Sequence, residues 1–317
     1  MDANPVPVGV TGVVSSAARQ LRDAGIDSAH VEAQLVCAHV LGVDRSVLPM
    51  ADGLDATAVA EVDRIVAARA RDRTPLQYLL GRATSGRLDL AVGPGVFIPR
   101  PETELLVENT LAALPAPGEG PGPVVVDLCA GSGTLALEIA HARPDAVVHA
   151  VELHGPALEW LRHNVAERAA AGDTPVEIHR GDATDHALLA QLRGAVDAVV
   201  SNPPYIPQTD DLPGDVLGQE PSTALFGGED GLAVITPLVA VAAGLLGPGG
   251  HLAVEHDDTT GATVAAVVWA QGSFGNVERH TDLAGRPRFV TATRLAGDHD
   301  DDHDDEIDPT VQKGITR

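Results

Sequence analysis

The sequence contains few cysteine, lysine or aromatic residues for its length. Its 317 residues include two cysteines, Cys37 and Cys129, and one lysine, Lys313, and Phe, Trp and Tyr together account for 3% of the chain. Two cysteines so far apart provide neither a disulfide framework nor the spacing of a metal site. We expect Cys37 to be a core residue on a helix. With so few aromatic side chains, the core must be built mainly from Ala, Val and Leu.

Long apolar runs and positive charge are also scarce. No apolar stretch approaches the length of a membrane span, and the N-terminal segment Met1–Pro5 lacks the basic and apolar regions of a secretory signal. These absences predict a cytoplasmic protein. The formal net charge of −24 argues against a protein that binds nucleic acid backbones through a general basic field, although it leaves room for a local basic patch.

The N-terminal part of the chain has the apolar periodicity of helices and predicts a small bundle over residues 15–82. The expected helices run from a cap at Ser15-Ser16 to about Gly25, from Ser28 to Leu41, and from Ala56 to Arg71. On the second helix, the apolar face is expected to carry Val31, Leu35, Ala38 and Leu41. The preceding residues, 1–14, are expected to be flexible.

A β-hairpin linker is expected over residues 83–98. Alternating apolar residues predict one strand at 88–92, Gly93-Pro94-Gly95 predicts a turn, and Val96-Phe97-Ile98 predicts the second strand. A helix should follow Pro99-Arg100-Pro101, with acidic residues in its first turn, where carboxylates suit the helix dipole.

From Val124 the pattern changes to strands that alternate with helices. The expected strands are at 124–127, 147–152, 176–179, 195–201, 251–255 and 288–293, and the expected helices are at 134–141, 156–171, 187–192, 231–246 and 260–271. This alternation predicts an α/β, Rossmann-like domain over residues 99–296, with a mostly parallel sheet and helices on both faces. The acidic tail over residues 297–317 has the composition of a disordered, solvated segment.

Polar or small residues follow successive strands of this sheet at its carboxyl edge. The first strand leads into the loop Asp127–Thr134, and such a strand–loop–helix unit forms nucleotide sites, although the dinucleotide fingerprint fails because Ala136 stands at its last glycine. Glu152 ends the second strand and can accept both ribose hydroxyls, and Asp182 follows the third, where an adenine amine can be held. Each carboxylate alone could equally be a capping residue. Their joint spacing favours a nucleotide-like site.

The fourth strand ends in Asn202-Pro203-Pro204-Tyr205. Two consecutive prolines have no N–H groups and fixed φ angles, so they form a rigid rim. The Asn202 side chain and the Pro203 carbonyl can then accept both N–H donors of a planar amide or base amine, while the ring of Tyr205 covers one face. A plain proline-rich surface turn is the alternative.

These motifs resemble those of class I S-adenosylmethionine methyltransferases. The Asn-Pro-Pro-Tyr form is shared by enzymes that methylate planar nitrogens of DNA adenine, rRNA guanine and protein glutamine. Three further segments are similar to the release-factor glutamine methyltransferase (PrmC/HemK) family: Arg73–Gly81, Ile98–Glu104 and Gln219–Leu225. The similarity covers about residues 15–295, and its most family-specific part is Pro-Arg-Pro-Glu-Thr-Glu.

The resemblance implies S-adenosylmethionine as cofactor and the glutamine of the Gly-Gly-Gln motif in class 1 peptide chain release factors as substrate. It implies that the helical bundle docks the release factor, and the reaction needs no metal and no covalent intermediate. The cofactor residues that it implies are Asp127, Cys129, Ala130, Gly131, Ser132, Gly133, Glu152, Asp182, Ala183 and Asn202. The substrate residues are Asn202, Pro203, Pro204 and Tyr205, of which Asn202, Pro203 and Tyr205 are expected to be catalytic.

Three positions depart from the family pattern. Cys129 replaces a glycine, which a small thiol tolerates where φ is negative. Ser85 stands where Phe is common in the hairpin, which affects local packing or partner contact. Ala183 stands where a large side chain often flanks adenine, which would lower the affinity for the cofactor.

Two other functions fit part of the sequence. An amino-methyltransferase that acts on rRNA guanine or DNA adenine shares the Asn-Pro-Pro-Tyr chemistry, but the charge of −24 and the lack of a basic or aromatic-rich recognition segment disfavour it. A catalytically idle methyltransferase fold is disfavoured by the intact Glu152 and Asn202. No general base is evident, because His149, His154 and His179 lie near strand ends and spacing assigns none of them a partner.

Overall fold

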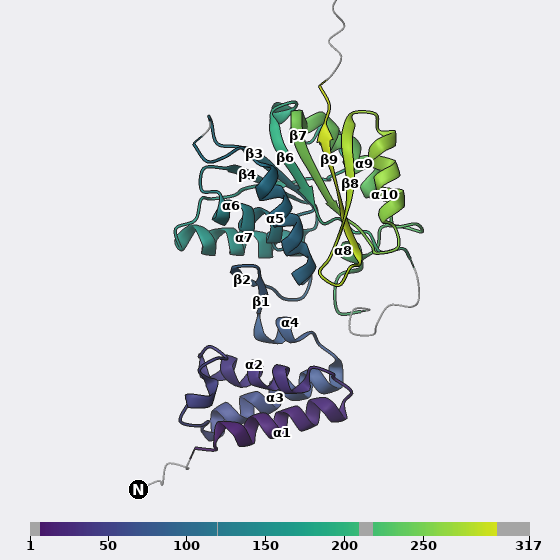
Figure 1. The fold of residues 1–317 in the computed structure, drawn as a ribbon. Helices are drawn as coiled ribbons and strands as arrows, with labels where there is room; N and C mark the ends of the chain where they lie inside the picture. The colour runs from purple at the N-terminus through teal and green to yellow at the C-terminus, as the bar shows by residue number, and fades with distance from the viewer. Residues whose placement is uncertain (1–6, 119, 209–217, 297–317) are drawn as a thin grey trace, which may run out of the picture.

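The N-terminal helices form a bundle at one end of the molecule (Figure 1). The computed structural model describes residues 7–118, 120–208 and 218–296. The elements of the bundle are α1 (Val10–Asp23), α2 (Ala29–Leu41), the 3-10 helix η1 (Leu48–Met50) and α3 (Ala56–Asp72), and α4 (Leu76–Leu80) leads on towards the sheet. The core of the bundle is aliphatic, and Cys37 lies fully buried within it, as expected.

The first helix begins earlier than the sequence analysis predicted. The residues of α1 that face the core recur at helical spacing and include Val10, Val13, Val14 and Ala17. Ser15 and Ser16, which were expected to cap the helix, lie inside it on the exposed side. Before the helix, Val8 pairs with Leu54 in an isolated β-bridge. The prediction of a flexible N-terminus is therefore wrong for residues 7–14, and residues 1–6 lie outside the described part.

The second helix ends as predicted, and one residue of its predicted buried face is exposed. Gly42 follows Leu41 with a left-handed φ of 65°, as is usual after a helix. Val31, predicted to face the core, is 43% exposed. The residues of α2 that are buried include the small side chains Ala29, Ala33, Cys37 and Ala38. Of the predicted face, Ala38 is buried and Leu35 and Leu41 pack against the core, so the prediction is wrong for Val31.

An ion pair is buried inside the bundle between α2 and α3. Arg69 donates to both carboxylate oxygens of Glu32 at 2.8 and 3.2 Å, and the two residues are 9% and 8% exposed. Removing one partner leaves a buried charge uncompensated, so we expect Arg69→Met to lower the free energy of unfolding by about 3–5 kcal/mol. Denaturant unfolding measures the change. Adding Glu32→Leu should restore most of the loss, and a double variant as unstable as the single one would contradict this explanation.

A short hairpin connects the bundle to the sheet domain, but its strands differ from those predicted. It consists of β1 (Arg82–Ser85) and β2 (Leu88–Ala91), which pair antiparallel around a turn at Gly86-Arg87. The segment Val96–Ile98, predicted as the second strand, is not a strand. Val96 and Ile98 are buried in a small cluster with Ala157 of the next domain. Their alternation therefore reflects packing against a helix, and the prediction of a hairpin over 83–98 is corrected to 82–91.

Seven strands form one sheet in the order β5-β4-β3-β6-β7-β9-β8, in which β9 runs opposite to the other six strands. The strands are β3 (Val124–Leu128), β4 (Val147–Glu152), β5 (Glu177–Arg180), β6 (Val196–Ser201), β7 (Leu246–Glu255), β8 (Phe274–Thr281) and β9 (Pro287–Arg294). The predicted mostly parallel sheet is confirmed. The sequence analysis did not predict β8, because this edge strand is mostly polar and only Phe274 is buried in it.

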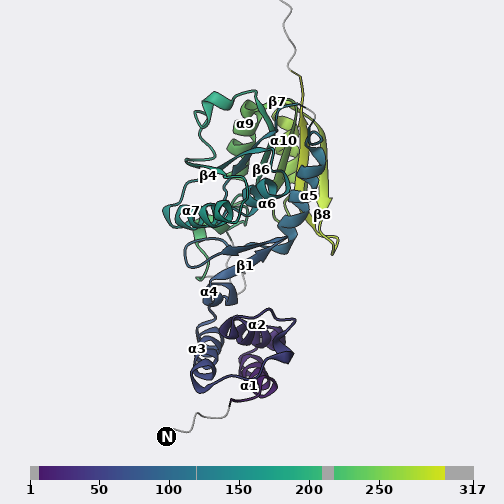
Figure 2. The same cartoon turned by 90° about the vertical axis from the view of Figure 1, so that its left-hand side faces the viewer.

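Helices cover both faces of the sheet (Figures 1 and 2). One face packs against α5 (Glu104–Ala113), α6 (Thr134–Ala142) and α7 (Gly155–Ala170), and the other against α9 (Ile235–Leu245) and α10 (Gly261–Ala270). The helix predicted at 187–192 is reduced to the 3-10 helix η3 (Ala190–Leu192), because Leu189 before it has a left-handed φ of 50°. Among the described residues, no helix is both long and apolar enough to cross a membrane.

Candidate active site

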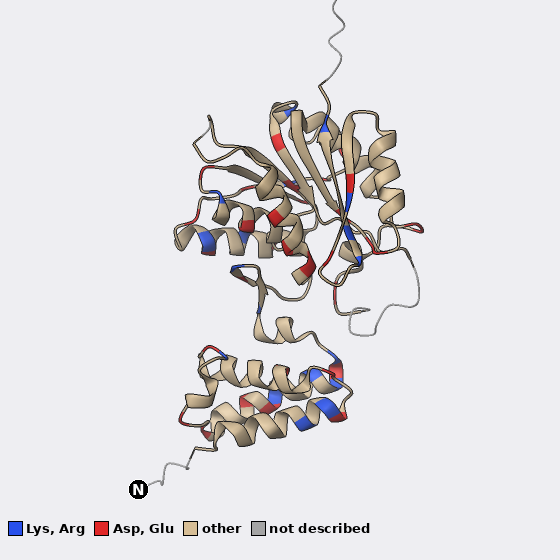
Figure 3. Ribbon diagram, in the orientation of Figure 1, with Lys and Arg blue, Asp and Glu red and all other residues tan. Residues whose placement is uncertain are grey.

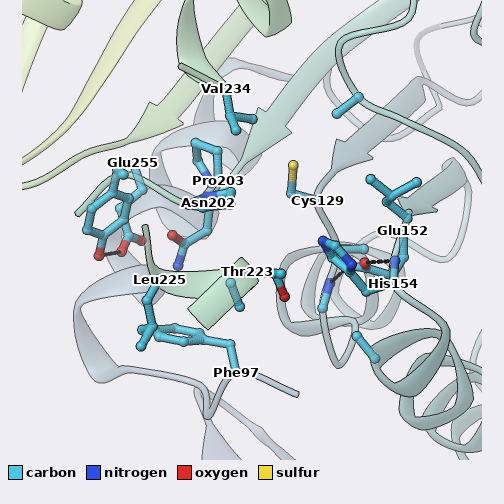
Figure 4. Close-up of a pocket in the computed structure, with 18 of the residues that line it drawn as sticks. Phe97, Cys129, Glu152, His154, Asn202, Pro203, Thr223, Leu225, Val234 and Glu255 are labelled. Atoms are coloured by element: carbon cyan, nitrogen blue, oxygen red, sulfur yellow. Dashed lines mark hydrogen bonds between the residues drawn. The ribbon is translucent and has the colours of Figure 1, made fainter. Parts of the chain in front are cut away.

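A cavity of roughly 680 Å³ opens at the carboxyl edge of the sheet. Figure 4 shows Asn202, Pro203 and Glu255 on one side of it, Glu152 and His154 on the other, and Cys129 between them. All but one of the predicted cofactor and substrate residues line this cavity: Asp127, Cys129, Ala130, Gly131, Ser132, Glu152, Asp182, Ala183, Asn202, Pro203, Pro204 and Tyr205. The ends of parallel strands thus bring together residues that are far apart in the chain.

Gly133 is the predicted cofactor residue that does not line the cavity. It precedes α6 with φ of 94°, and a Cβ there would lie 2.8 Å from the side chain of Leu161 on α7. This glycine therefore allows the loop to turn and α6 to approach α7, and its contact with the cofactor stays a prediction. Gly131 differs, because a Cβ there would meet no atom within 4 Å, so its backbone is open towards the cavity that it lines.

Cys129 lies in the left-handed region with φ of 67°, so the condition of a negative φ is not met. Side chains other than glycine are strained there, and β-branched ones most. We expect Cys129→Gly to raise the free energy of unfolding by up to about 1 kcal/mol, and Cys129→Val to lower it by about 1–3 kcal/mol. Denaturant titration of the two variants tests this, and equal stabilities would show that the backbone at residue 129 is not strained.

Two carboxylates hold the loop after β3 in place. Glu152 accepts hydrogen bonds from the backbone N–H groups of Gly131 at 2.9 Å and His154 at 2.7 Å. Asp127 is fully buried and its Oδ2 accepts from the N–H of Ala136 at 3.1 Å, while its Oδ1 has no partner among the residues that the structure describes. Burial raises the pKa of Asp127 well above its usual value. This loop is therefore preorganised, and Oδ1 of Asp127 remains as an acceptor that no described residue uses.

Asp182 caps the turn that follows β5 and also lines the cavity. Its Oδ1 accepts from the hydroxyl of Thr184 at 2.7 Å and from the N–H of the same residue at 2.8 Å, which is a capping arrangement. These hydrogen bonds hold the pKa of Asp182 below its usual value, so the carboxylate is charged at neutral pH. The residue also lines the cavity beside Ala183, which is 6% exposed.

The side chain of Asn202 ends a chain of hydrogen bonds that runs through Thr103 to Glu255. Its Nδ2 lies 3.4 Å from Oγ1 of Thr103, and this hydroxyl donates to Oε2 of Glu255 at 2.9 Å. Since the single hydroxyl hydrogen is given to Glu255, Thr103 must accept from Asn202, and this fixes Nδ2 as the atom that faces it. Oδ1 of Asn202 receives no hydrogen bond from the described part of the protein and is available to a ligand.

Glu255 connects the two parts of the Asn-Pro-Pro-Tyr motif. Its Oε1 accepts from the hydroxyl of Tyr205 at 2.9 Å, while its Oε2 accepts from Thr103. The residue is 3% exposed, and burial raises the pKa of Glu255 to about 7. The sequence analysis assigned no role to Thr103 or Glu255. A signal was present for Glu255, because it ends an apolar strand as Glu152 does.

Glu220 braces the segment that follows the hairpin. Its carboxylate accepts from the N–H of Ile98 at 3.1 Å and from the guanidinium of Arg100, and Glu220 is 6% exposed. The guanidinium of Arg100 also stacks over the ring of Phe97 at 4.8 Å. Two family-like segments, Ile98–Glu104 and Gln219–Leu225, are therefore held to each other on one side of the cavity.

Comparison with known proteins identifies the family. Residues 13–81 match the PrmC N-terminal domain, and residues 88–214 match the methyltransferase small domain. The release factor glutamine methyltransferase of Mycolicibacterium smegmatis is 51% identical over 284 residues, which cover 89% of this chain and 97% of that protein. That of Corynebacterium glutamicum is 47% identical over 277 residues, which cover 87% of this chain and 95% of that protein. The chain belongs to the release factor glutamine methyltransferase family.

The family predicted from the motifs is thereby confirmed. A solved protein-(glutamine-N5) methyltransferase from Alicyclobacillus acidocaldarius is 29% identical, and the alignment covers 65% of this chain and all of that one with a TM-score of 0.38.

At the hairpin position where the family commonly has Phe, Ser85 is 2% exposed and its hydroxyl has no partner in the described ranges. Ser85 therefore packs inside the protein with its hydroxyl unsatisfied by the described residues.

The residues of this family member fit S-adenosylmethionine, which carries positive charge on its sulfonium and amino groups. Three carboxylates line the same end of the cavity: Asp127, Glu152 and Asp182. The unpartnered Oδ1 of Asp127 is a buried acceptor, and a cation beside it offsets the cost of ionising this carboxyl. Each Glu152 oxygen accepts one backbone hydrogen bond and keeps a lone pair for a ribose hydroxyl.

Proposed function

We propose that the protein transfers the methyl group of S-adenosylmethionine to the side-chain amide nitrogen of the glutamine in the Gly-Gly-Gln motif of class 1 peptide chain release factors. The observation that carries the proposal is the orientation of Asn202. Its Nδ2 donates to Thr103, so its Oδ1 stays available in the cavity. The next residue in the chain, Pro203, has a carbonyl that can act as a second acceptor. Two neighbouring acceptors match the two N–H donors of a primary amide.

The role of these acceptors follows from the chemistry of amides. The lone pair of an amide nitrogen is delocalised, so the nitrogen is a poor nucleophile. When bound, S-adenosylmethionine supplies a methyl group that is activated by the attached sulfonium. Asn202 and Pro203 accept both hydrogens of the substrate amide, favour a more tetrahedral nitrogen and aim its lone pair. The ring of Tyr205, held through its hydroxyl by Glu255, packs against the amide.

The helical bundle is the proposed docking unit for the release factor. It carries exposed apolar side chains, among them Val31 at 43%, Val47 at 42% and Met50 at 75%. Methionine is among the residue types enriched at surfaces that bind proteins. Figure 3 shows Arg interspersed with Asp and Glu in both the bundle and the sheet domain, which suits a protein partner better than a nucleic acid backbone.

Methyl transfer to a purified release factor tests the proposal. Labelled S-adenosylmethionine is supplied with the intact factor, with its Gln→Ala variant at Gly-Gly-Gln, and separately with DNA and rRNA. We expect label on the intact factor alone. Label on nucleic acid would move the function to a base amino-methyltransferase. Bound cofactor without label on any substrate would indicate an idle fold, so cofactor binding is measured by calorimetry alongside.

A further inference from the structure

Three side chains of the kind that binds transition metals meet on neighbouring strands, outside the cavity. In the parallel register of β4 and β5, His149 lies opposite Glu177, and Val151 lies opposite His179. Because side chains alternate along a strand, His149, Glu177 and His179 share one face. None of the three lines the active-site cavity. Spacing in the sequence assigns neither histidine a partner, because only the strand register brings them together.

The ligand atoms of the three side chains converge. Nδ1 of His149 lies 3.0 Å from Nε2 of His179 and 3.3 Å from Oε2 of Glu177, and all three atoms lie within 4.8 Å of one another. Two ligands of a tetrahedral Zn²⁺ with bonds of about 2.0–2.1 Å are separated by about 3.3 Å. The two distances from His149 are therefore close to those between the ligands of such a site, before any side chain moves.

The contacts of His149 also suit a metal. Its side chain is buried, with 5% of the residue exposed, so the ring is held by its neighbours. Without a metal, a single Nδ1 faces both an imidazole nitrogen and a carboxylate oxygen, and it can offer them one shared hydrogen at most. A cation at the point where the three atoms converge satisfies all of them.

We propose that His149, Glu177 and His179 form a binding site for a divalent transition metal ion such as Zn²⁺, with water completing the coordination. The site ties the four-residue edge strand β5 to β4. The connection that follows β5 contains only the 3-10 helix η3, so this strand has less helical cover than its neighbours. Imidazole and carboxylate ligands favour Zn²⁺ and related ions over Mg²⁺ or Ca²⁺.

Zinc binding by the full chain tests the proposal, measured by competition with a chromophoric chelator and by the rise in melting temperature on adding ZnCl₂. His299 and His303 in the acidic tail could also hold metal, so every protein in the test carries His299→Ala and His303→Ala. His179→Gln is the main variant, since buried His149 is less tolerant of change. His163→Gln is the matched control, because this exposed histidine also faces a carboxylate, Glu167 at 3.6 Å, but no second histidine.

We expect one zinc ion per chain and a higher melting temperature with zinc. His179→Gln should weaken zinc binding by at least about tenfold and abolish the thermal shift, whereas His163→Gln should change neither. Co²⁺ should give the strong visible absorption of a low-coordinate site in the control and lose it in His179→Gln. Absence of zinc binding in the tail-substituted parent, or equal binding by His179→Gln, would overturn the proposal and leave the two histidines as a hydrogen-bonded pair.

Discussion

Asn202→Ala is expected to lower kcat for methylation of the release factor by about 10²- to 10³-fold, which is the usual cost of removing one preorganised polar group that acts on the reacting atoms. The alanine variant cannot accept a substrate N–H, so the amide nitrogen stays planar and its lone pair is not aimed. Binding of S-adenosylmethionine should change little, because the cofactor loop is held by Glu152 and Asp127. Single-turnover kinetics and calorimetry measure the two quantities.

The control for this variant is Asn109→Ala. Asn109 lies on α5 outside the lining of the active-site cavity, so its loss should leave kcat within about twofold of the parent. Turnover by Asn202→Ala equal to that of the control would rule out the assigned role. A loss of cofactor affinity that accounts for the whole loss of turnover would instead place Asn202 in the cofactor site alone.

The residues at the strand ends could be predicted because one rule places them. Buried parallel strands read as apolar runs, and their carboxyl ends meet at one edge of the sheet. Glu152, Asp182 and Asn202 each follow such a run, so their meeting at the cavity required no knowledge of side-chain packing. The same rule found the loop at Asp127, although the position of Gly133 behind the loop depends on how closely α6 and α7 approach each other.

Other parts of the site depend on contacts that no local pattern reports. Thr103 and Glu255 are separated by 152 positions, and their hydrogen bond depends on where η2 (Pro101–Thr103) meets the end of β7. The positive φ of Cys129 follows from the path of the loop rather than from the residue. Likewise, the pairing of His149 with His179 follows from the register of two strands.

Glu255→Gln is expected to lower kcat/KM at pH 8 by up to about 10²-fold and to remove a pH dependence that the parent shows. Only the ionised carboxylate accepts from both Thr103 and Tyr205, and this leaves Thr103 to accept from Asn202. A protonated Glu255 donates a hydrogen itself, which frees the Thr103 hydroxyl hydrogen to turn towards Asn202 and disturbs the orientation of its amide. The kcat/KM of the parent should therefore rise with pH through about 7, the pKa of Glu255.

The same variant should become more stable relative to the parent as pH rises. The folded-state pKa of Glu255 is raised from 4.5 to about 7, so its contribution to stability is fully present below pH 4.5 and is lost as pH rises through 7. Between those values the parent loses about 1.4 kcal/mol of stability per pH unit from this group, and glutamine does not ionise.

Glu278→Gln, at an exposed position on β8, is the control for both measurements. It should keep the acid limb of the parent, which is the rise of kcat/KM with pH, and also its stability profile. An acid limb near pH 7 that persists in Glu255→Gln would assign the titration to another group, and the absence of a relative gain in stability would show that the buried carboxyl is not destabilised by ionisation.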